Sequence, residues 1–422
     1  MSFSWKKILI WIVIAAAALL LVYVLLRFFS NNSSNSQNGT PTFGNASQNS
    51  SSGQNSGSQN PSGNQPLNVG TSASSTASAQ KVFLISDGPV VAATLLEEGS
   101  PSVTNARFIT ADDGHVLDLP LDVPGSVPRI VSQTTIPGIE RALWTDKGGG
   151  VLMQYLEGST IKTVHLAFQA VLSSTSTPTA PQVIIQFLPD NIEDLSVSPD
   201  GSHVTYLLRA SVGLVGYTSL SDGTRAQKLF SLPLSEVAVS WSSQGTILAY
   251  SKASAGVPGI LFSINTKNGA VSPLLYGQGI LAAADQAFSH LLYQINDGGS
   301  ALSYIDTLKT GAVTPLSGFS LNPEQCSSSG QEPATNNQLY CAAPVSAPGG
   351  NFLDLWHQGA ASTPDNIISL NLANGTTTLL AEPGGSGGEN SNVMGIAVSP
   401  LGRYLSFVNK NNGRLWGVRL SQ

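Results

Sequence analysis

Hydrophobic and polar residues divide the chain into three zones. An unbroken apolar run extends from Ile8 to Leu26, a stretch without any charged residue covers residues 30–80, and short alternations of apolar and polar residues continue from Lys81 onward. Alternation with a period of two is typical of half-buried β-strands, and no part of the third zone keeps the 3.6-residue period of an amphipathic helix. The pattern therefore predicts a hydrophobic helix, a linker and a domain built of β-strands.

The apolar run is long enough to cross a membrane. At about 1.5 Å per residue it would form a helix roughly 28 Å long, close to the ~30 Å hydrocarbon core of a bilayer. Lys6 and Lys7 precede the run and Arg27 follows it, so the positive-inside rule places the N-terminus in the cytoplasm. A cleaved signal peptide is the alternative, but the run ends without a small-x-small cleavage site. We therefore expect an uncleaved transmembrane helix that contacts the lipid bilayer from Ile8 to Phe29.

The uncharged stretch is predicted to be a disordered linker. It consists almost entirely of Ser, Asn, Gly, Gln and Thr, and it has too little apolar surface to offset the entropy cost of ordering. As a flexible coil it would span about 40 Å root-mean-square, enough to hold a domain away from the membrane. We thus expect three parts, which are residues 1–29 with the transmembrane helix, 30–80 as the linker and 81–422 as the folded domain.

A hairpin motif recurs along the third zone. In Ser198-Pro199-Asp200-Gly201, two alternating runs flank a type I turn, and the Gly is expected at positive φ. Gly245 and Gly402 hold the same place in later copies, whereas Phe288 replaces the Gly in another. The aromatic residue of the second strand recurs at intervals of 43 to 51 residues, and once of 67. A period of 40–50 residues with four strands per unit is typical of a β-propeller.

Seven such units are predicted, although six to eight remain possible. The first unit is degenerate, and the 280–317 unit departs from the motif. An insertion of about twenty residues, 343–363, interrupts the sixth unit. The last unit lacks a fourth strand, and residues 81–85 at the opposite end of the domain provide a suitable one. The predicted fold is therefore an all-β, seven-bladed β-propeller closed by its own first strand, preceded by one transmembrane helix and a disordered linker.

These hairpins resemble the repeats of TolB-type β-propellers and, more loosely, those of WD-repeat proteins. The residues that carry the resemblance are Ser198-Pro199-Asp200-Gly201, Ser399-Pro400-Leu401-Gly402 and Trp241-Ser-Ser-Gln-Gly245. The resemblance covers most of residues 139–420. It implies the propeller fold and a habit of binding proteins or ligands, but no particular activity, because propellers serve many unrelated functions.

The composition leaves little material for catalysis. Charged residues make up only 10% of the chain and the net charge is −6, so the basic stripe of a nucleic-acid-binding protein is missing. Gly384-Gly-Ser-Gly-Gly388 matches the G-x-S-x-G pattern but lacks the strand and helix of a nucleophile elbow. The five histidines are scattered without a second ligand at metal-binding spacing. They are His115, His165, His203, His290 and His357. We therefore assign no catalytic, cofactor-binding or metal-binding residue and expect no cofactor.

Two acidic groups are predicted to be structural. Asp112-Asp113-Gly114 lacks the further oxygen ligands of a calcium loop, so a plain turn is expected. Asp190, Glu193 and Asp194 are expected to form a solvated blade edge.

Cys326 and Cys341 are the candidate disulfide. They fall in one predicted unit, on its first strand and beside Tyr340 of its second, so their Cβ atoms could approach disulfide distance. An extracytoplasmic, oxidising compartment favours the bond, and two free buried thiols are the alternative.

These features predict a non-enzymatic scaffold. It would be a single-pass protein of a bacterial cell envelope that presents a propeller outside the cytoplasm and binds another envelope protein or an extracellular ligand. One alternative is a hydrolase or lyase with its site in the central channel. Another is a structural or sensory component of an envelope assembly, in which the propeller is a spacer.

Overall fold

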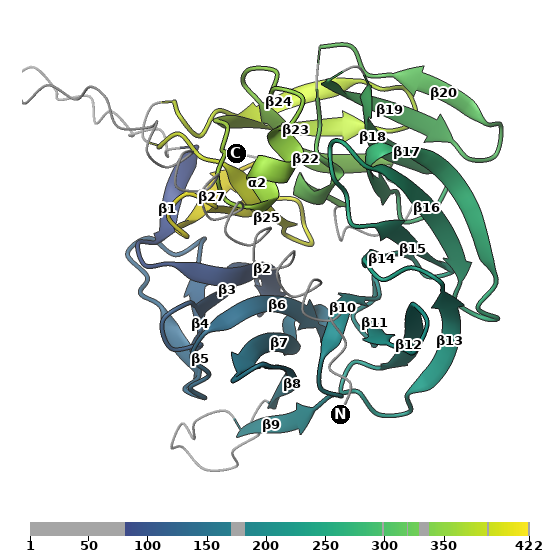
Figure 1. The fold of residues 1–422 in the computed structure, drawn as a ribbon. Coiled ribbons are helices and arrows are strands. Elements are labelled where there is room, and N and C mark those ends of the chain that lie inside the picture. The colour runs from purple at the N-terminus through teal and green to yellow at the C-terminus, as the bar shows by residue number, and fades with distance from the viewer. Residues whose placement is uncertain are drawn as a thin grey trace, which may run out of the picture. The chain divides into compact units, whose positions relative to one another are not determined.

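The chain forms a β-propeller, a ring of antiparallel sheets (Figure 1). The computed structural model describes residues 81–169, 182–297, 299–318, 320–328, 337–385 and 388–420. They belong to one compact unit, Thr76–Gln422. In these ranges no helix is long and apolar enough to cross a membrane. The predicted transmembrane helix and linker, residues 8–29 and 30–80, lie outside the described residues.

Five sheets have four strands each. The first contains β2 (Val90–Glu98), β3 (Val103–Thr110), β4 (Val116–Pro120) and β5 (Arg129–Ser132). The second contains β6 (Ile139–Thr145), β7 (Gly150–Glu157), β8 (Thr160–Gln169) and β9 (Gln182–Phe187). The third contains β10 (Ile192–Val197), β11 (His203–Arg209), β12 (Leu214–Leu220) and β13 (Gln227–Leu232). Another contains β21 (Cys326–Ser328), β22 (Gln338–Pro344), β23 (Asp365–Asn371) and β24 (Thr377–Ala381).

The fifth four-stranded sheet closes the ring. It contains β25 (Val393–Val398), β26 (Tyr404–Asn409), β27 (Leu415–Arg419) and β1 (Val82–Ser86). Val82 lies opposite Val418, and Leu84 lies opposite Trp416. The prediction that residues 81–85 supply the fourth strand of the last blade is therefore confirmed.

The remaining strands form a single seven-stranded sheet, which corrects the prediction of seven separate blades. It contains β14 (Val237–Ser243), β15 (Thr246–Ser251), β16 (Pro258–Asn265), β17 (Val271–Ala284), β18 (His290–Asp297), β19 (Ser300–Thr307) and β20 (Ala312–Pro315). The sheet is continuous because β17 runs through without a turn, and Gln278 is paired with both Pro258 of β16 and Asn296 of β18. Among the described residues, five sheets are therefore separate four-stranded blades.

The hydrophobic core lies between the faces of neighbouring sheets. One cluster joins Leu207 and Phe230 of the third sheet to Val239 and Ile247 of the seven-stranded sheet. Such packing removes one face of each sheet from water and is worth roughly 1.5–3 kcal/mol for each fully buried large apolar side chain.

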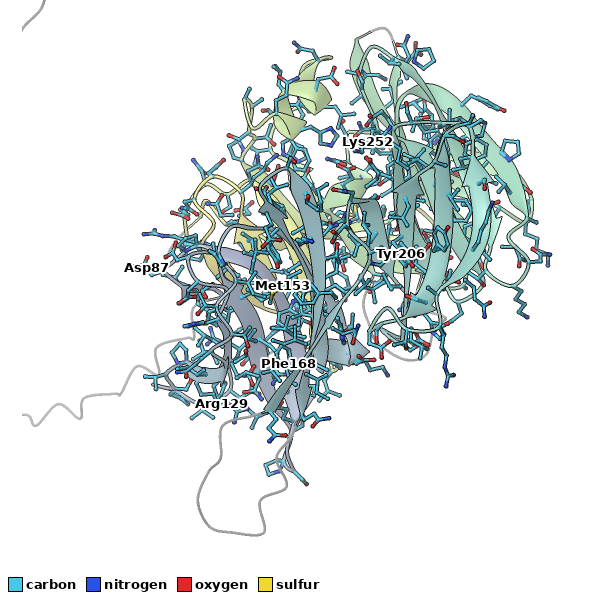
Figure 2. The ribbon with its side chains drawn as sticks, turned by 60° about the horizontal axis from the view of Figure 1, so that its bottom comes forward. Asp87, Arg129, Met153, Phe168, Tyr206 and Lys252 are labelled. Atoms are coloured by element: carbon cyan, nitrogen blue, oxygen red, sulfur yellow. A yellow bond between two sulfur atoms is a disulfide. The ribbon has the colours of Figure 1, made fainter. Side chains whose placement is uncertain are left out.

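Individual side chains illustrate this packing between sheets (Figure 2). Met153 and Tyr206 are almost completely buried between sheets. Arg129 and Lys252, by contrast, expose more than half of their side chains to solvent.

The insertion between β22 and β23 contains a short helix that the sequence analysis did not predict. This helix, α2 (Phe352–His357), buries Leu353 and Trp356. Its Asp354 carboxylate accepts hydrogen bonds from the Ala255 amide at 3.2 Å, and the Trp356 indole donates to Asn392 Oδ1 at 3.0 Å. The helix thus bridges the β15–β16 loop and the start of the last blade.

Candidate binding site at the hairpin end of the channel

The first strand of each blade lies nearest the centre of the ring. Strand β2 contacts β6 and β25, and β10 contacts β6 and β14, an arrangement that can be followed in Figure 1. A hollow of about 1020 Å³ lies among these inner strands, at the end where each first strand turns into the second. Its lining residues are 93–98, 107, 144, 146–149, 197–199, 201, 327, 328, 396–398, 400 and 401. Apolar, charged and backbone groups of five blades therefore converge on one opening.

The repeated turn motif shapes this opening. Gly201 and Gly402 have φ of 79° and 65°, as predicted, and each amide donates to the serine carbonyl three residues earlier. Phe288 takes the same left-handed conformation, with φ of 51°. The prediction for Gly245 is wrong, because Gly245 does not have a positive φ; Ser243 pairs with Thr246, so this turn is shorter than the one at Gly201.

The hairpin between β6 and β7 is backbone-strained. Asp146 and Lys147 have φ of 50° and 53°, and Gly148 follows at 90°. Left-handed conformations of residues other than glycine cost about 1–3 kcal/mol each and gather at functional sites. The Asp146 amide donates to the Gly201 carbonyl at 3.0 Å. A Cβ atom on Gly201 would come within 2.6 Å of that amide nitrogen, so the two hairpins pack backbone against backbone.

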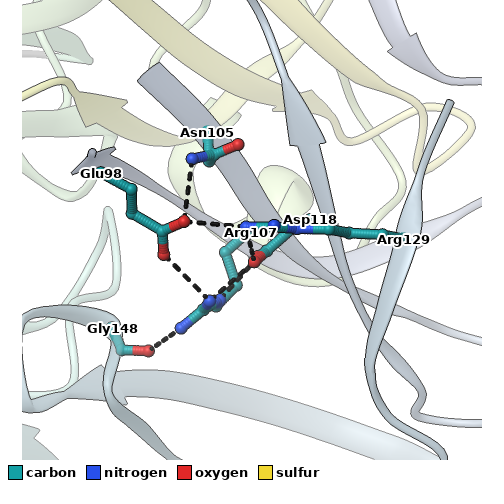
Figure 3. Close-up of polar contacts among 6 residues, drawn as sticks. All are labelled: Glu98, Asn105, Arg107, Asp118, Arg129 and Gly148. Atoms are coloured by element: carbon teal, nitrogen blue, oxygen red, sulfur yellow. Dashed lines mark hydrogen bonds and ion pairs between the residues drawn. The ribbon is translucent and has the colours of Figure 1, made fainter. Parts of the chain in front are cut away.

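A buried ion pair, Arg107–Asp118, contacts the strained hairpin and is extended toward the surface by Glu98 and Arg129 (Figure 3). Arg107 Nε and Nη2 each donate to the Asp118 carboxylate at 2.7 Å, while Arg107 Nη1 donates to the Gly148 carbonyl at 2.8 Å. Glu98 accepts from Arg129 at 2.8 Å and from Asn105 at 3.1 Å. The sequence analysis missed this network; the available signal was the pair of opposite charges at Arg107 and Asp118, eleven residues apart across one hairpin, in a chain with few charges.

His165 lies beneath the same hairpin. Its Nε2 is 2.9 Å from Thr145 Oγ1, and the imidazole is almost fully buried. Burial lowers the pKa of His165, while the charge of Asp146 opposes that shift. A neutral imidazole is therefore favoured at this position near neutral pH.

The other four histidines lie apart from one another. His115 pairs with Asp113, His290 with Asp285, and His357 with Glu324 at 2.7 Å. His203 Nδ1 lies 2.7 Å from Ser202 Oγ. No three His, Cys, Asp or Glu side chains among the described residues are grouped closely enough to hold a metal ion.

The acidic residues that the sequence predicted to be structural form local hydrogen bonds and ion pairs, with the exception of Asp194. Asp113 accepts from the amide of His115 at 3.1 Å and from the Thr110 hydroxyl, as a turn residue does. Asp190 pairs with Lys162 and Glu193 with Arg209.

Asp194 is buried rather than part of a solvated edge. Its carboxylate pairs with Arg141 and accepts from the Val239 amide at 2.6 Å. The prediction failed here because the two neighbouring blades supply one donor each, Arg141 from β6 and the Val239 amide from β14.

Cys326 and Cys341 face each other on β21 and β22. Their Cα atoms are 4.1 Å apart, and their sulfur atoms are bonded in a disulfide. In the G-x-S-x-G segment, Ser386 and Gly387 lie outside the described residues, and no structure is assigned to that motif.

Comparison with known proteins adds no family assignment. The sequence matches no family model and no curated protein. Similar solved structures include TolB from Acinetobacter baumannii, at 13% identity and a TM-score of 0.38 over 79% of this chain and 64% of that chain, less than two thirds of its length. The β-propeller domain of the Trilobed protease from Pyrococcus furiosus matches at 10% identity and a TM-score of 0.48, over 79% of this chain and 98% of that chain. The β-propeller domain of Cps50 (Swd1) from Myceliophteria thermophila matches at 11% identity and a TM-score of 0.47, over 81% of this chain and 100% of that chain.

Proposed function

We propose that this chain is a membrane-anchored, extracytoplasmic β-propeller that binds another protein or a ligand at the hairpin end of its channel. The hollow of about 1020 Å³ among the inner strands carries this proposal. Small-molecule pockets commonly enclose about 300–1,000 Å³, and an opening of this size also admits a protein loop. Its wall combines buried apolar side chains such as Leu95 and Val398 with the exposed Leu401, Asp146 and Lys147.

We propose a binding rather than a catalytic role for this opening. Two of its three carboxylates, Glu97 and Glu98, pair with Arg403 and Arg129, and the third, Asp146, accepts from the Ser221 hydroxyl at 3.2 Å. The Arg107 guanidinium is held by Asp118. Charged groups committed to one another are poorly placed to transfer a proton to or from a substrate.

The binding role is testable by site-specific crosslinking. A photo-crosslinking residue at Leu401, which is 58% exposed at the mouth, should capture a partner from the envelope. The same residue at Val212, which is 77% exposed in the β11–β12 turn, is the matched control. Capture at Leu401 should be lost in a chain that also carries Lys147→Glu. Equal capture at both positions would refute the site.

The membrane anchor and the compartment are part of the same proposal. Residues 8–26 would span the bilayer, and the Cys326–Cys341 disulfide is consistent with an oxidising compartment. A protease added to intact cells should cleave within residues 30–80 and release a folded domain that begins near residue 81. Protection of the domain, with cleavage only near the N-terminus, would reverse the orientation.

We further infer that the seven-stranded sheet is equivalent to two blades that share β17, which would make seven blades. The first half of β17 pairs with β16 and the second half with β18. Gly279, with φ of 59°, provides a bend between the two halves. A crystal structure in which the two halves of β17 follow a single straight strand axis would contradict this count.

A further inference from the structure

A second recess, separate from the channel mouth, lies next to helix α2. Its volume is about 260 Å³, which is space for roughly nine water molecules at about 30 Å³ each. The residues around it are Gly359, Ala360, Ala361, Ser362, Asn392, Lys410 and Asn411. None of these residues lines the channel mouth.

Asn392 presents hydrogen-bond donors that have no protein acceptor. Its Oδ1 accepts from the Trp356 indole at 3.0 Å and from Gln325 Nε2 at 3.4 Å. An indole N–H can only donate, so this contact determines which end of the amide is oxygen. The residue is 1% exposed, and Asn392 Nδ2 is buried without a hydrogen-bond partner. A buried amide donor left unpaired costs about 1–3 kcal/mol. Asn392 is one of the residues around the recess, and an acceptor that reaches Nδ2 from there would relieve that cost.

Lys410 brings a positive charge to the same recess. Its ammonium donates to the Trp356 carbonyl and lies 3.5 Å from the centre of the Trp356 ring. The contacts therefore join Lys410 and Asn392 to one indole side chain. Burial lowers the pKa of Lys410, while the charge of Glu324 raises it. An anion in the recess would offset the cost of burying the ammonium.

The carboxylates nearby are committed to other groups. Glu324 pairs with His357 at 2.7 Å. Glu389 accepts from Asn412 at 2.7 Å and pairs with Arg414. Among the described residues, no carboxylate forms an ion pair with Lys410. The recess thus has a cation and an unpaired amide donor but no protein anion.

We propose that this recess binds an oxyanion, either a carboxylate or a phosphate group of a small molecule, with Lys410 and Asn392 as its ligands. The ammonium would supply the charge, and one N–H bond of Asn392 Nδ2 would supply a directed hydrogen bond. Charge-assisted hydrogen bonds of this kind are the stronger class in proteins. The proposal is independent of partner binding at the channel mouth.

The test is the thermal stability of the full-length protein in detergent, at constant ionic strength. Sodium acetate and inorganic phosphate are titrated in place of sodium chloride. One of them should raise the melting temperature saturably, since a ligand that binds only the folded state stabilises it. A response to acetate alone identifies a carboxylate site, and a response to phosphate alone identifies a phosphate site.

Two variants and one control test whether the rise in melting temperature comes from binding in this recess. Asn392→Asp keeps the acceptor for the Trp356 indole but replaces the free amide donor by a carboxylate oxygen, so the apparent Kd should rise at least tenfold. Lys410→Gln should have a similar effect, whereas Lys252→Gln, a change at an exposed lysine that pairs with Glu236, should bind like the unaltered protein. No saturable response to either anion would overturn the proposal, and so would an unchanged Kd in either folded variant.

Discussion

Asp365 should make the propeller less stable as the pH rises from 4 to 7. Its carboxyl group is 2% exposed at the start of β23, and it joins two neighbouring blades. One oxygen accepts from the Val393 amide of β25 at 2.8 Å and from Gln325 Nε2 at 3.3 Å, and the other accepts from the Thr363 hydroxyl at 2.9 Å. Burial raises the pKa of Asp365 to about 6, although these hydrogen bonds oppose the shift.

The size and sign of the effect follow from that shift. The pKa of about 6 lies roughly two units above the ordinary value of 3.8, and one unit corresponds to about 1.4 kcal/mol. Because the folded protein holds the proton more tightly than the unfolded chain, the contribution is fully present below pH 4 and is lost as the pH passes through 6. The free energy of unfolding should therefore fall by about 3 kcal/mol from this group alone.

Asp365→Asn isolates this contribution. The amide oxygen can accept from Val393 and Gln325, and its NH₂ group can donate to the Thr363 hydroxyl, so the contacts survive without a titrating proton. Urea unfolding of both proteins between pH 4 and pH 8 gives the difference in unfolding free energy. That difference should move by about 3 kcal/mol in favour of the Asn variant as the pH rises. A constant difference, or one that moves the other way, would refute the argument.

Three further outcomes are expected. Deletion of β1 leaves the last blade with an open edge, so the cooperative thermal transition should be lost or fall steeply; an unchanged melt would show that the ring closes without it. Gly201→Ala should cost about 1–3 kcal/mol, because the residue has positive φ and no room for a Cβ, whereas Gly245→Ala should be nearly neutral; equal costs in urea unfolding would refute this account of the two turns. Joint replacement of Cys326 and Cys341 by Ser should lower the unfolding free energy by roughly 3 kcal/mol, the entropy value for a loop of 15 residues. No change on replacement would mean that the bond does not constrain the unfolded chain.

The parts of the fold that depend on local chemistry were predictable from the sequence. The turn Ser198-Pro199-Asp200-Gly201 encodes its own geometry, since Pro fixes one torsion and Gly permits another. The closing role of β1 followed from counting strands, because a blade with three strands needs a fourth. These inferences required no knowledge of distant contacts.

Apart from closure by β1, the parts that depend on distant neighbours were not predictable. Helix α2 has only six residues, and Trp356 is held by Asn392 and Lys410, which lie far along the chain. A new unit was expected to begin near residue 280, but β17 continues through Gly279 and pairs on both sides of it. The channel mouth combines residues of five blades, so its composition becomes visible only once the ring is closed.

Closure by β1 also delays the completion of the fold during synthesis. Val82 must pair with Val418, so the first strand of the domain leaves the ribosome long before its partner exists. At about 5–20 residues per second, the delay is roughly 20 to 70 seconds. Throughout that time the uncharged segment Val-Phe-Leu-Ile-Ser has no partner strand and resembles an exposed, aggregation-prone edge. The first strand therefore stays open to pairing with other chains until the last strand, β27, has been synthesised.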